Sequence, residues 1–259
     1  SVSMSGTSQI LTDSGAIVVR GDGSIQLTKV FSTSGSIQLI ANYGGIGSGL
    51  GSDKFGSIID ASVDESVSNL TTTGSVRIDL DVRAPVRELV FNALELEFTA
   101  ASVDGTSTGL PRLDPETQTA VLALPVPLSP GPHQLTLAFR GKITQHATGL
   151  YAEKYQTPEG DRIFLGTQLE PTEARRILPC WDEPAFRATF QLTVTIPSGR
   201  TAVSNTPVTA ERTLAGGKRE VAFAPTPAMS SYLLVLCVGE LEVLRDEVDG
   251  VQLGIWTRR

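Results

Sequence analysis

The sequence lacks the residues that mark most catalytic centres. Histidine occurs only at His133 and His146, 13 positions apart in a strand-and-loop context, and neither HExxH nor CxxC is present. These two histidines therefore cannot supply the i, i+4 helical pair of a typical zinc site. GxSxG, Walker and dinucleotide-binding glycine motifs are also missing, so no nucleophile elbow or phosphate loop is recognised. The sequence predicts no catalytic residue, no metal ligand and no cofactor in this chain.

Positive charge and long apolar runs are scarce as well. The 21 Lys and Arg residues are outnumbered by 28 Asp and Glu residues, which gives a net charge of −7 and no basic run. An acidic chain of this kind argues against nucleic acid as a partner. The longest apolar run, residues 232–238, has the length of a strand, far short of the roughly 18 residues of a spanning helix. We therefore expect no transmembrane segment.

Cysteine is limited to Cys180 and Cys237, which excludes a disulfide scaffold of the kind found in small secreted domains. Both lie in apolar sequence surroundings, so we expect two buried free thiols. Two thiols leave the compartment undecided, with a cytoplasmic location favoured. Neither they nor the rest of the sequence indicates an oligomeric state.

Proline is absent from the N-terminal part of the chain, because all 15 prolines lie between Pro85 and Pro227. The segment 1–69 is instead rich in Ser and Gly and poor in charged side chains. Such a shift in composition predicts two regions of different architecture. We therefore divide the chain into a Ser/Gly-rich segment, residues 1–69, and a second domain, residues 70–259.

The first region carries a loose repeat, in which a glycine is followed by a short run of β-branched residues. Its copies are SGAIVV, GDGSIQL, TSGSIQLI and FGSII, at irregular intervals between residues 14 and 59. One interpretation is a β-solenoid or adhesin-like repeat, and the other is a set of hairpins or a poorly ordered segment. The glycine-rich residues 44–51 are typical of a flexible linker.

The second region predicts one strand after another. Residues 74–83 alternate Val, Ile, Leu and Val with polar residues, which is typical of a strand with one buried face. Turn-forming residues recur throughout and long helical periods are absent, so we expect an all-β fold, a sandwich or several sheets. The further expected strands are residues 89–98, 114–127, 134–139, 188–196, 220–223 and 232–238.

One segment does not fit the strand pattern. Residues 167–190 read TQLEPTEARRILPCWDEPAFRATF. Thr172 is placed to cap a short helix that carries Arg175 and Arg176 in its last turn, and Pro179 would end it. The structural interpretation is a corner in which Arg175 or Arg176 pairs with Asp182 or Glu183.

This segment resembles the N-terminal domain of the aminopeptidase N family, whose members are zinc metallo-aminopeptidases. The similarity rests on residues 149–151 (GLY), 167–176 and 179–190 of the corner. Further similar motifs follow in the same order as in the family. They are SNTP at residues 204–207, PAMSSYL at 227–233 and VGELE at 238–242. Residues 73–96 are similar to the family's opening strands, so the resemblance covers about residues 70–259.

The resemblance implies a large, mostly antiparallel β domain, often described as a saddle, that packs on a zinc catalytic domain. It also implies that Gln168 and Glu170 line the substrate site, with Glu170 binding the free α-amino group of a peptide. A carboxylate that pairs with an ammonium group admits only substrates with a free N-terminus. In this interpretation Arg175, Trp181 and Asp182 have the structural role of fixing the corner, as does Glu183.

The sequence also departs from the family. The zinc-binding HExxH helix and the GAMEN loop are missing, so we expect the isolated chain to bind no stoichiometric zinc and to be inactive. The family's Pro-x-x-Tyr-x-Leu opening strand is missing too, which predicts an open sheet edge before residue 70. A fragment, a fusion and a mis-assembled reading frame all remain open.

Two functions follow from this sequence. The first is the N-terminal, substrate-binding domain of a zinc aminopeptidase that removes N-terminal residues from peptides. Its partners would be a peptide N-terminus and a catalytic domain that carries the zinc. The second is a non-catalytic β binding or adhesion module with a degenerate peptidase-like domain. Residue preference is not readable from the sequence.

Overall fold

The computed structural model describes residues 54–61 and 70–258, together with the backbone of six short strands between Val2 and Ala41. The only helices among these residues are two three-residue 3-10 helices, which confirms the all-β prediction. The chain forms two compact units, residues 1–49 with 239–259 and residues 50–238. The predicted boundary between residues 69 and 70 stays a prediction.

The smaller unit pairs its N-terminal strands in parallel. Val2 lies opposite Ile25, Ile10 opposite Val30, and Ile17 opposite Ile37. Partners in all three pairs are therefore separated by stretches of chain of similar length. The strands are β1 (Val2–Ser3), β2 (Ile10–Thr12), β3 (Ala16–Gly21), β4 (Ile25–Gln26), β5 (Val30–Ser32) and β6 (Ile37–Ala41). A C-terminal hairpin of β22 (Leu241–Val248) and β23 (Val251–Arg258) joins them through β3.

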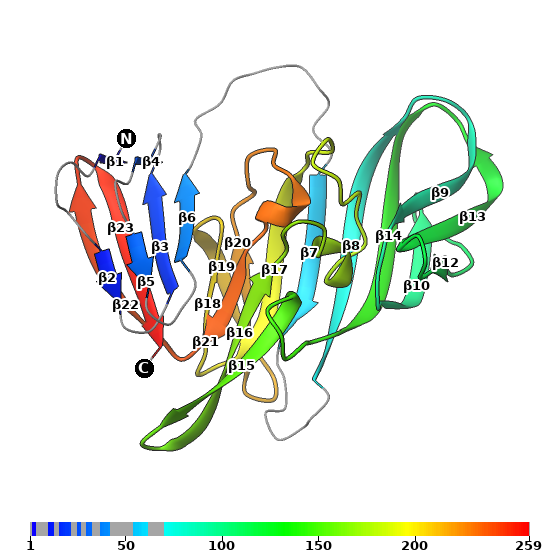
Figure 1. The fold of residues 1–259 in the computed structure, drawn as a ribbon. Coiled ribbons are helices and arrows are strands. Elements are labelled where there is room, and N and C mark those ends of the chain that lie inside the picture. The colour runs from blue at the N-terminus through cyan, green and yellow to red at the C-terminus, as the bar shows by residue number, and fades with distance from the viewer. Residues whose placement is uncertain are drawn as a thin grey trace. The chain divides into compact units, whose positions relative to one another are not determined.

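The larger unit is built on one eight-stranded sheet, in the order β11-β10-β14-β8-β7-β17-β20-β19 (Figure 1). Apart from the parallel pair β7–β17, its strand pairs are antiparallel. Its strands are β7 (Lys54–Asp60), β8 (Thr71–Val82), β10 (Glu97–Val103), β11 (Thr106–Ser107), β14 (Gly131–Lys142), β17 (Thr189–Pro197), β19 (Val208–Leu214) and β20 (Lys218–Phe223).

Alternation along the strands explains this sheet. In β14, Leu135, Leu137 and Phe139 are buried and the residues between them are partly exposed. In β17, Val194 and Ile196 are fully buried in the same alternating pattern. Since successive side chains in a strand point to opposite faces, one face of the sheet forms the core.

Strand β7 corrects the expectation of an open sheet edge. It pairs with β8 on one side, where Ser57 lies opposite Val76, and with β17 on the other, where Ile58 lies opposite Thr193. The fourth copy of the repeat, FGSII, therefore fills the position in front of β8, without the family's Pro-x-x-Tyr-x-Leu pattern. The expected open edge is wrong because both neighbours of β7 are hydrogen-bonded to it.

Two smaller sheets complete the larger unit. One has the order β12-β13-β9 and the other the order β15-β16-β21-β18. Their strands are β9 (Val86–Asn92), β12 (Arg112–Asp114), β13 (Thr119–Leu128), β15 (Gly149–Thr157), β16 (Gly160–Gln168), β18 (Thr201–Ser204) and β21 (Leu236–Gly239). The hairpin of β15 and β16 extends from the unit at its turn (Figure 1).

Two sequence-based strands differ from the structure. Residues 89–98 were expected as one strand but divide between β9 and β10, because Glu95 turns the chain with a left-handed φ of 56°. Residues 232–238 were also expected as one strand. They begin in the 3-10 helix η2 (Ser231–Leu233), and β21 starts only at Leu236.

Several expectations lie outside the described residues. They include the linker at residues 44–51 and the repeat glycines Gly15, Gly23 and Gly35. Within the parts of the chain that the structure describes, no helix has the length and apolar character to cross a membrane.

Candidate functional site

Gln168 and Glu170 lie where β16 ends and the corner begins. Both side chains are exposed, whereas Leu169 between them is 2% exposed and belongs to the core. Gln168 is paired in the hairpin with Gly149 of β15, which has no side chain to cover it. The buried leucine thus anchors the backbone between two side chains that remain accessible to solvent.

The chain turns immediately after Glu170. The Glu173 N–H donates to the Leu169 carbonyl at 2.9 Å, and the 3-10 helix η1 (Ala174–Arg176) follows. The predicted short helix is present with both arginines in its last turn, but Thr172 does not cap it. Glu173 occupies the N-cap position and makes no side-chain cap bond.

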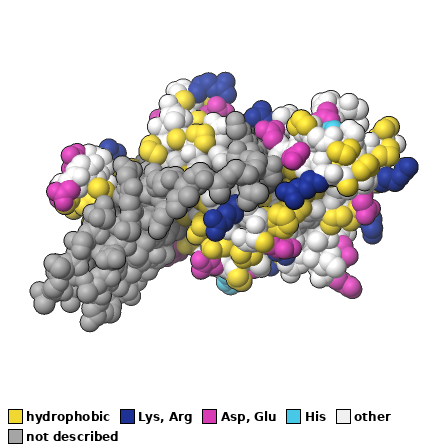
Figure 2. Space-filling view, turned by 90° about the horizontal axis from the view of Figure 1, so that it is seen from above, with side chains coloured by type: hydrophobic (Ala, Val, Ile, Leu, Met, Phe, Trp, Pro, Cys, Tyr) yellow, Lys and Arg dark blue, Asp and Glu magenta, His cyan; other side chains and the backbone are white. Residues whose placement is uncertain are grey.

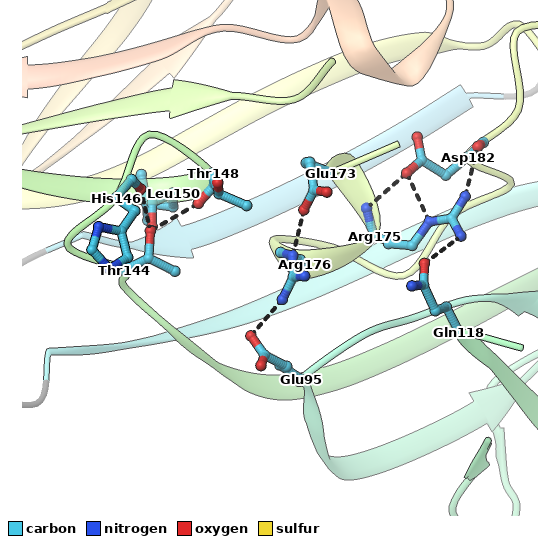
Figure 3. A network of polar contacts seen from close by, with 10 residues as sticks. All are labelled: Glu95, Gln118, Thr144, His146, Thr148, Leu150, Glu173, Arg175, Arg176 and Asp182. Atoms are coloured by element: carbon cyan, nitrogen blue, oxygen red, sulfur yellow. Dashed lines mark hydrogen bonds and ion pairs between the residues drawn. The ribbon is translucent and has the colours of Figure 1, made fainter. Parts of the chain in front are cut away.

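A buried ion pair holds this turn (Figure 3). Arg175 Nε donates to Asp182 Oδ2 at 3.1 Å, and the Arg175 backbone N–H donates to the same oxygen at 3.2 Å. Arg175 Nη2 also donates to the Asp182 carbonyl at 3.0 Å. These side chains are 10% and 1% exposed. The predicted pairing of an arginine with Asp182 is confirmed, and it closes the corner.

Further hydrogen bonds tie the pair to other parts of the larger unit. Arg175 Nη1 donates to Gln118 Oε1 at 2.9 Å, and Ser231 Oγ donates to Asp182 Oδ1 at 2.5 Å. Asn92 Oδ1 accepts from the Asp182 N–H at 2.9 Å. Both carboxylate oxygens of Asp182 therefore have donors, which is the condition under which a buried charge is tolerated.

A second arginine fixes the outer side of the turn. Arg176 pairs through Nε with Glu173 and through Nη1 with Glu95 Oε2, the latter at 2.6 Å, and Figure 3 shows it between the two carboxylates. Arg176 and Glu173 are partly buried, while Glu95 is 41% exposed. The carboxylate of Glu173 is thereby committed to Arg176, unlike that of Glu170, which forms no ion pair with a described residue.

Tyr151 lies on the face of the β15–β16 hairpin that also carries Gln168, and it was not predicted from the sequence as a site residue. Tyr151 lies opposite Gly166 in the ladder, and a Cβ at position 166 would stand 2.9 Å from its Oη. The phenol therefore covers Gly166, two positions before Gln168 on the same face. The available signal was a glycine inside a strand, which often marks close approach of another group.

The two cysteines are buried free thiols, as predicted. Burial raises the pKa of Cys237 to about 12. Burial is also the main cause that raises the pKa of Cys180, and the nearby Asp182 carboxylate adds to it. Both thiols are therefore neutral near pH 7 and cannot act as nucleophiles.

The described residues include no cluster of three or more His, Cys, Asp or Glu side chains suited to a metal ion. His133 is paired with Asp104 on the surface at 2.7 Å, and His146 lies in the loop before β15. On the face seen in Figure 2, acidic and basic side chains are interspersed among apolar ones. The described residues do not fit a zinc site, and what the corner offers chemically is an exposed carboxylate held on a braced turn.

Such an arrangement defines a β domain that presents polar side chains at a fixed position. Comparison with known proteins places it in a family. The model of the Peptidase M1 N-terminal domain matches residues 57–233, and the chain therefore belongs to this family.

Relatives of known identity agree with the family match. Aminopeptidase N of Acetobacter pasteurianus is 37% identical over 195 residues, which cover 75% of this chain and 55% of that protein. Aminopeptidase M1-A of Oryza sativa subsp. japonica is 35% identical over 72% of this chain and 22% of its own length. Puromycin-sensitive aminopeptidase of Caenorhabditis elegans is 33% identical over 71% and 20%, respectively. The chain thus spans about half or less of the length of these relatives.

Proposed function

We propose that this aminopeptidase N-terminal domain binds the free amino terminus of a peptide, with Glu170 as the group that pairs with the α-ammonium. Gln168 contributes the neighbouring wall and a polar amide. The whole protein would then remove N-terminal residues from peptides, by means of a zinc catalytic domain that the described residues do not form. In this proposal the chain selects and orients substrate and performs no bond cleavage.

One observation carries the proposal most directly, namely the alternation of exposed Gln168, buried Leu169 and exposed Glu170. Of the neighbouring acids of the corner, Glu173 pairs with Arg176 and Asp182 with Arg175, whereas Glu183 is exposed, as Glu170 is. Glu170 is the exposed carboxylate that stands next to Gln168 at the end of β16, where it is accessible to an incoming cation. A carboxylate that accepts hydrogen bonds from an ammonium group forms a charge-assisted contact.

The braced corner adds a second argument. A binding group works best when its position is set before the ligand arrives, because less conformational entropy is then lost on binding. The Arg175–Asp182 pair and its hydrogen bonds to Gln118, Asn92 and Ser231 provide such support for the turn. The network itself is not the binding group, since its carboxylate oxygens are already occupied.

The test measures peptide binding to the full 259-residue chain through the changes in its NMR chemical shifts as peptide is added. A tripeptide with a free N-terminus is compared with the same peptide acetylated at its N-terminus. We expect the free peptide to bind more tightly to the native chain. Glu170→Gln should weaken its binding by about fivefold, the equivalent of about 1 kcal/mol for a partly solvated charged contact.

A matched control is Glu159→Gln at the turn of the β15–β16 hairpin. Glu159 is also exposed, and the length of β16 separates it from Glu170 by roughly 30 Å at the rise of a strand. It should leave binding unchanged. Equal affinity for free and acetylated peptides, or equal effects of the two variants, would contradict the proposed role of Glu170.

The smaller unit favours a second candidate function. Its three parallel strand pairs, which join segments at similar separations along the chain, resemble successive turns of a repeat architecture, which commonly serves as a binding surface. A non-catalytic binding or adhesion module would accommodate this unit. Sequencing the transcript beyond residue 259 separates the two functions, because a continuation into HExxH supports the aminopeptidase and a verified stop codon supports the module.

A further inference from the structure

A cavity of about 400 Å³ opens in the larger unit, away from Gln168 and Glu170. Its wall is formed where the ends of β8 and β9 meet the corner at Cys180 and Trp181, the start of β17, and residues 229–231. The volume lies within the range of small-molecule sites, roughly 300 to 1,000 Å³. Neither proposed substrate-binding residue lines it.

The inner wall of the cavity is apolar. Leu80 and Val86 are only partly buried although they pack against the core, and Leu89 and Phe190 lie in the core behind them. Aliphatic surface around a concavity favours an apolar ligand body.

Two aromatic rings also border the space. Trp181 is partly exposed and meets Phe91 edge-on, with ring centroids 6.2 Å apart. Phe186 is 49% exposed, which is unusual for a side chain of its size and apolar character. Because aromatic rings prefer to pack against other apolar groups, these two residues add to the preference of the cavity for an apolar ligand body.

The rim of the cavity carries charge of both signs, with an excess of positive charge. Arg83 and Arg187 line it together with Asp81, and all three are exposed. Among the described residues, neither guanidinium group has an ion-pair or hydrogen-bond partner, in contrast to Arg175 and Arg176 nearby. Guanidinium groups match carboxylates in geometry and can bind them through two hydrogen bonds.

We propose that this cavity binds a small hydrophobic carboxylate, whose apolar body fills the space beside Trp181 and Phe186 and whose anionic group pairs with Arg83 and Arg187 at the rim. The two guanidinium groups outnumber the single carboxylate of Asp81, which favours an anion over a cation.

The other polar groups of the wall do not oppose this choice. Ser231 already donates to Asp182, so its hydroxyl proton is committed. Cys180 is a neutral thiol because burial raises its pKa. Neither group therefore presents a negative charge to an incoming carboxylate.

Tryptophan fluorescence of the full chain tests the proposal. The chain has two tryptophans, and Trp256→Phe leaves Trp181 at the cavity as the only emitter. The probe is 4-phenylbutyrate, compared with 4-phenylbutanol and 4-phenylbutylamine, which share its apolar body. We expect a saturable change of Trp181 emission with the carboxylate. Binding should be about tenfold weaker for the alcohol, which lacks the two charged contacts, and weaker still for the amine.

Variants at the rim give the second measurement. Arg83→Gln combined with Arg187→Gln should weaken the binding of 4-phenylbutyrate by about tenfold and leave the binding of 4-phenylbutanol unchanged, since only the charged contacts are lost. Arg87→Gln is the matched control, because Arg87 is exposed on β9 and does not line the cavity. The proposal is overturned if the emission change does not saturate. It is also overturned if the three probes bind alike, or if the double variant behaves as Arg87→Gln does. Because Glu170 takes no part, the result is independent of the peptide-binding test.

Discussion

The corner of residues 169–184 and the β19–β20 hairpin both contain arginine–carboxylate pairs, but they use them differently. In the corner the Arg175 and Asp182 side chains are 10% and 1% exposed. In the hairpin the Arg212 and Glu220 side chains are 69% and 25% exposed. A charge removed from water depends on its partner, whereas an exposed charge keeps its hydration when the partner is lost.

The backbone explains why the two regions differ in this way. Strands β19 and β20 are joined by a ladder of backbone hydrogen bonds from Val208–Phe223 to Leu214–Lys218. This ladder holds the hairpin together without the ion pair between Arg212 and Glu220. The backbone hydrogen bonds of the corner belong to the turn around η1 and to an isolated bridge between Asn92 and Cys180, and not to a strand ladder. The backbone N–H groups of the corner at Arg175 and Asp182 are satisfied instead by the side chains of Asp182 and Asn92.

The largest effect is therefore expected in the corner. Arg175→Ala leaves the Asp182 carboxylate buried without its main partner, and breaking one side of a buried pair costs about 3–5 kcal/mol. Urea unfolding in a Trp256→Phe background, followed by Trp181 emission, measures this loss in the larger unit. We also expect the variant to lose the preference for peptides with a free N-terminus, because the turn that carries Glu170 is no longer fixed.

Lys at the same position refines this experiment. Arg175→Lys keeps the charge but not the fork of donors that reaches Asp182 and Gln118, so it should recover only part of the stability. If Arg175→Ala lowers stability by less than about 1 kcal/mol, as surface pairs do, the distinction between the two regions fails.

The corner also shows what the sequence could predict. Apolar alternation identified β8, β14 and β17, because each has one buried face. The Arg175–Asp182 pair was anticipated as one of several arginine–acid pairings within a short segment. The further partners of this pair were not predictable, because they lie far away in sequence. Asn92 and Ser231 are 90 and 49 positions from Asp182, and Gln118 is 57 positions from Arg175.

Other parts were mispredicted for identifiable physical reasons. Strand β7 contains Gly56 and Ser57, typical of the preceding repeat, and its role depends on pairing with β17, which follows much later in the chain. The cavity near Trp181 was missed because its wall gathers residues from several separate segments. Gln168 and Glu170 were identified through the resemblance to the aminopeptidase N family, and their role remains the proposal that Glu170→Gln tests.

The ion pair of His133 and Asp104 is intermediate in exposure between the buried pair of the corner and the exposed pair of the hairpin. His133 Nδ1 is 2.7 Å from Asp104 Oδ2, with side chains 13% and 48% exposed. The hydrogen bond to Asp104 raises the pKa of His133 above 6.5, and the bonds from His133 and the Gln134 N–H lower the pKa of Asp104 below 3.8. The pair thus stabilises the fold fully between pH 3.8 and 6.5.

The signs of the two ends follow from these directions. Above pH 6.5 the contribution of His133 is lost as the pH rises through its raised pKa, and below pH 3.8 that of Asp104 is lost as the pH falls through its lowered pKa. NMR titration should find the pKa of His133 raised above 6.5, and Asp104→Asn should lower the pKa of His133. If the pKa of His133 is unchanged in that variant, the His133–Asp104 pair does not stabilise the fold and has no place between the corner pair and the hairpin pair.

The smallest effect is expected for the exposed pair of the hairpin. Arg212 Nη2 donates to both carboxylate oxygens of Glu220, at 3.1 and 3.2 Å, yet both groups keep contact with water. A double-mutant cycle of Arg212→Ala and Glu220→Ala should give a coupling energy below about 1 kcal/mol that falls as salt is raised. The same cycle for Arg175 and Asp182 should give a larger coupling with little dependence on salt, because buried pairs are screened less. Equal couplings in the two cycles would show that burial does not separate the corner from the hairpin.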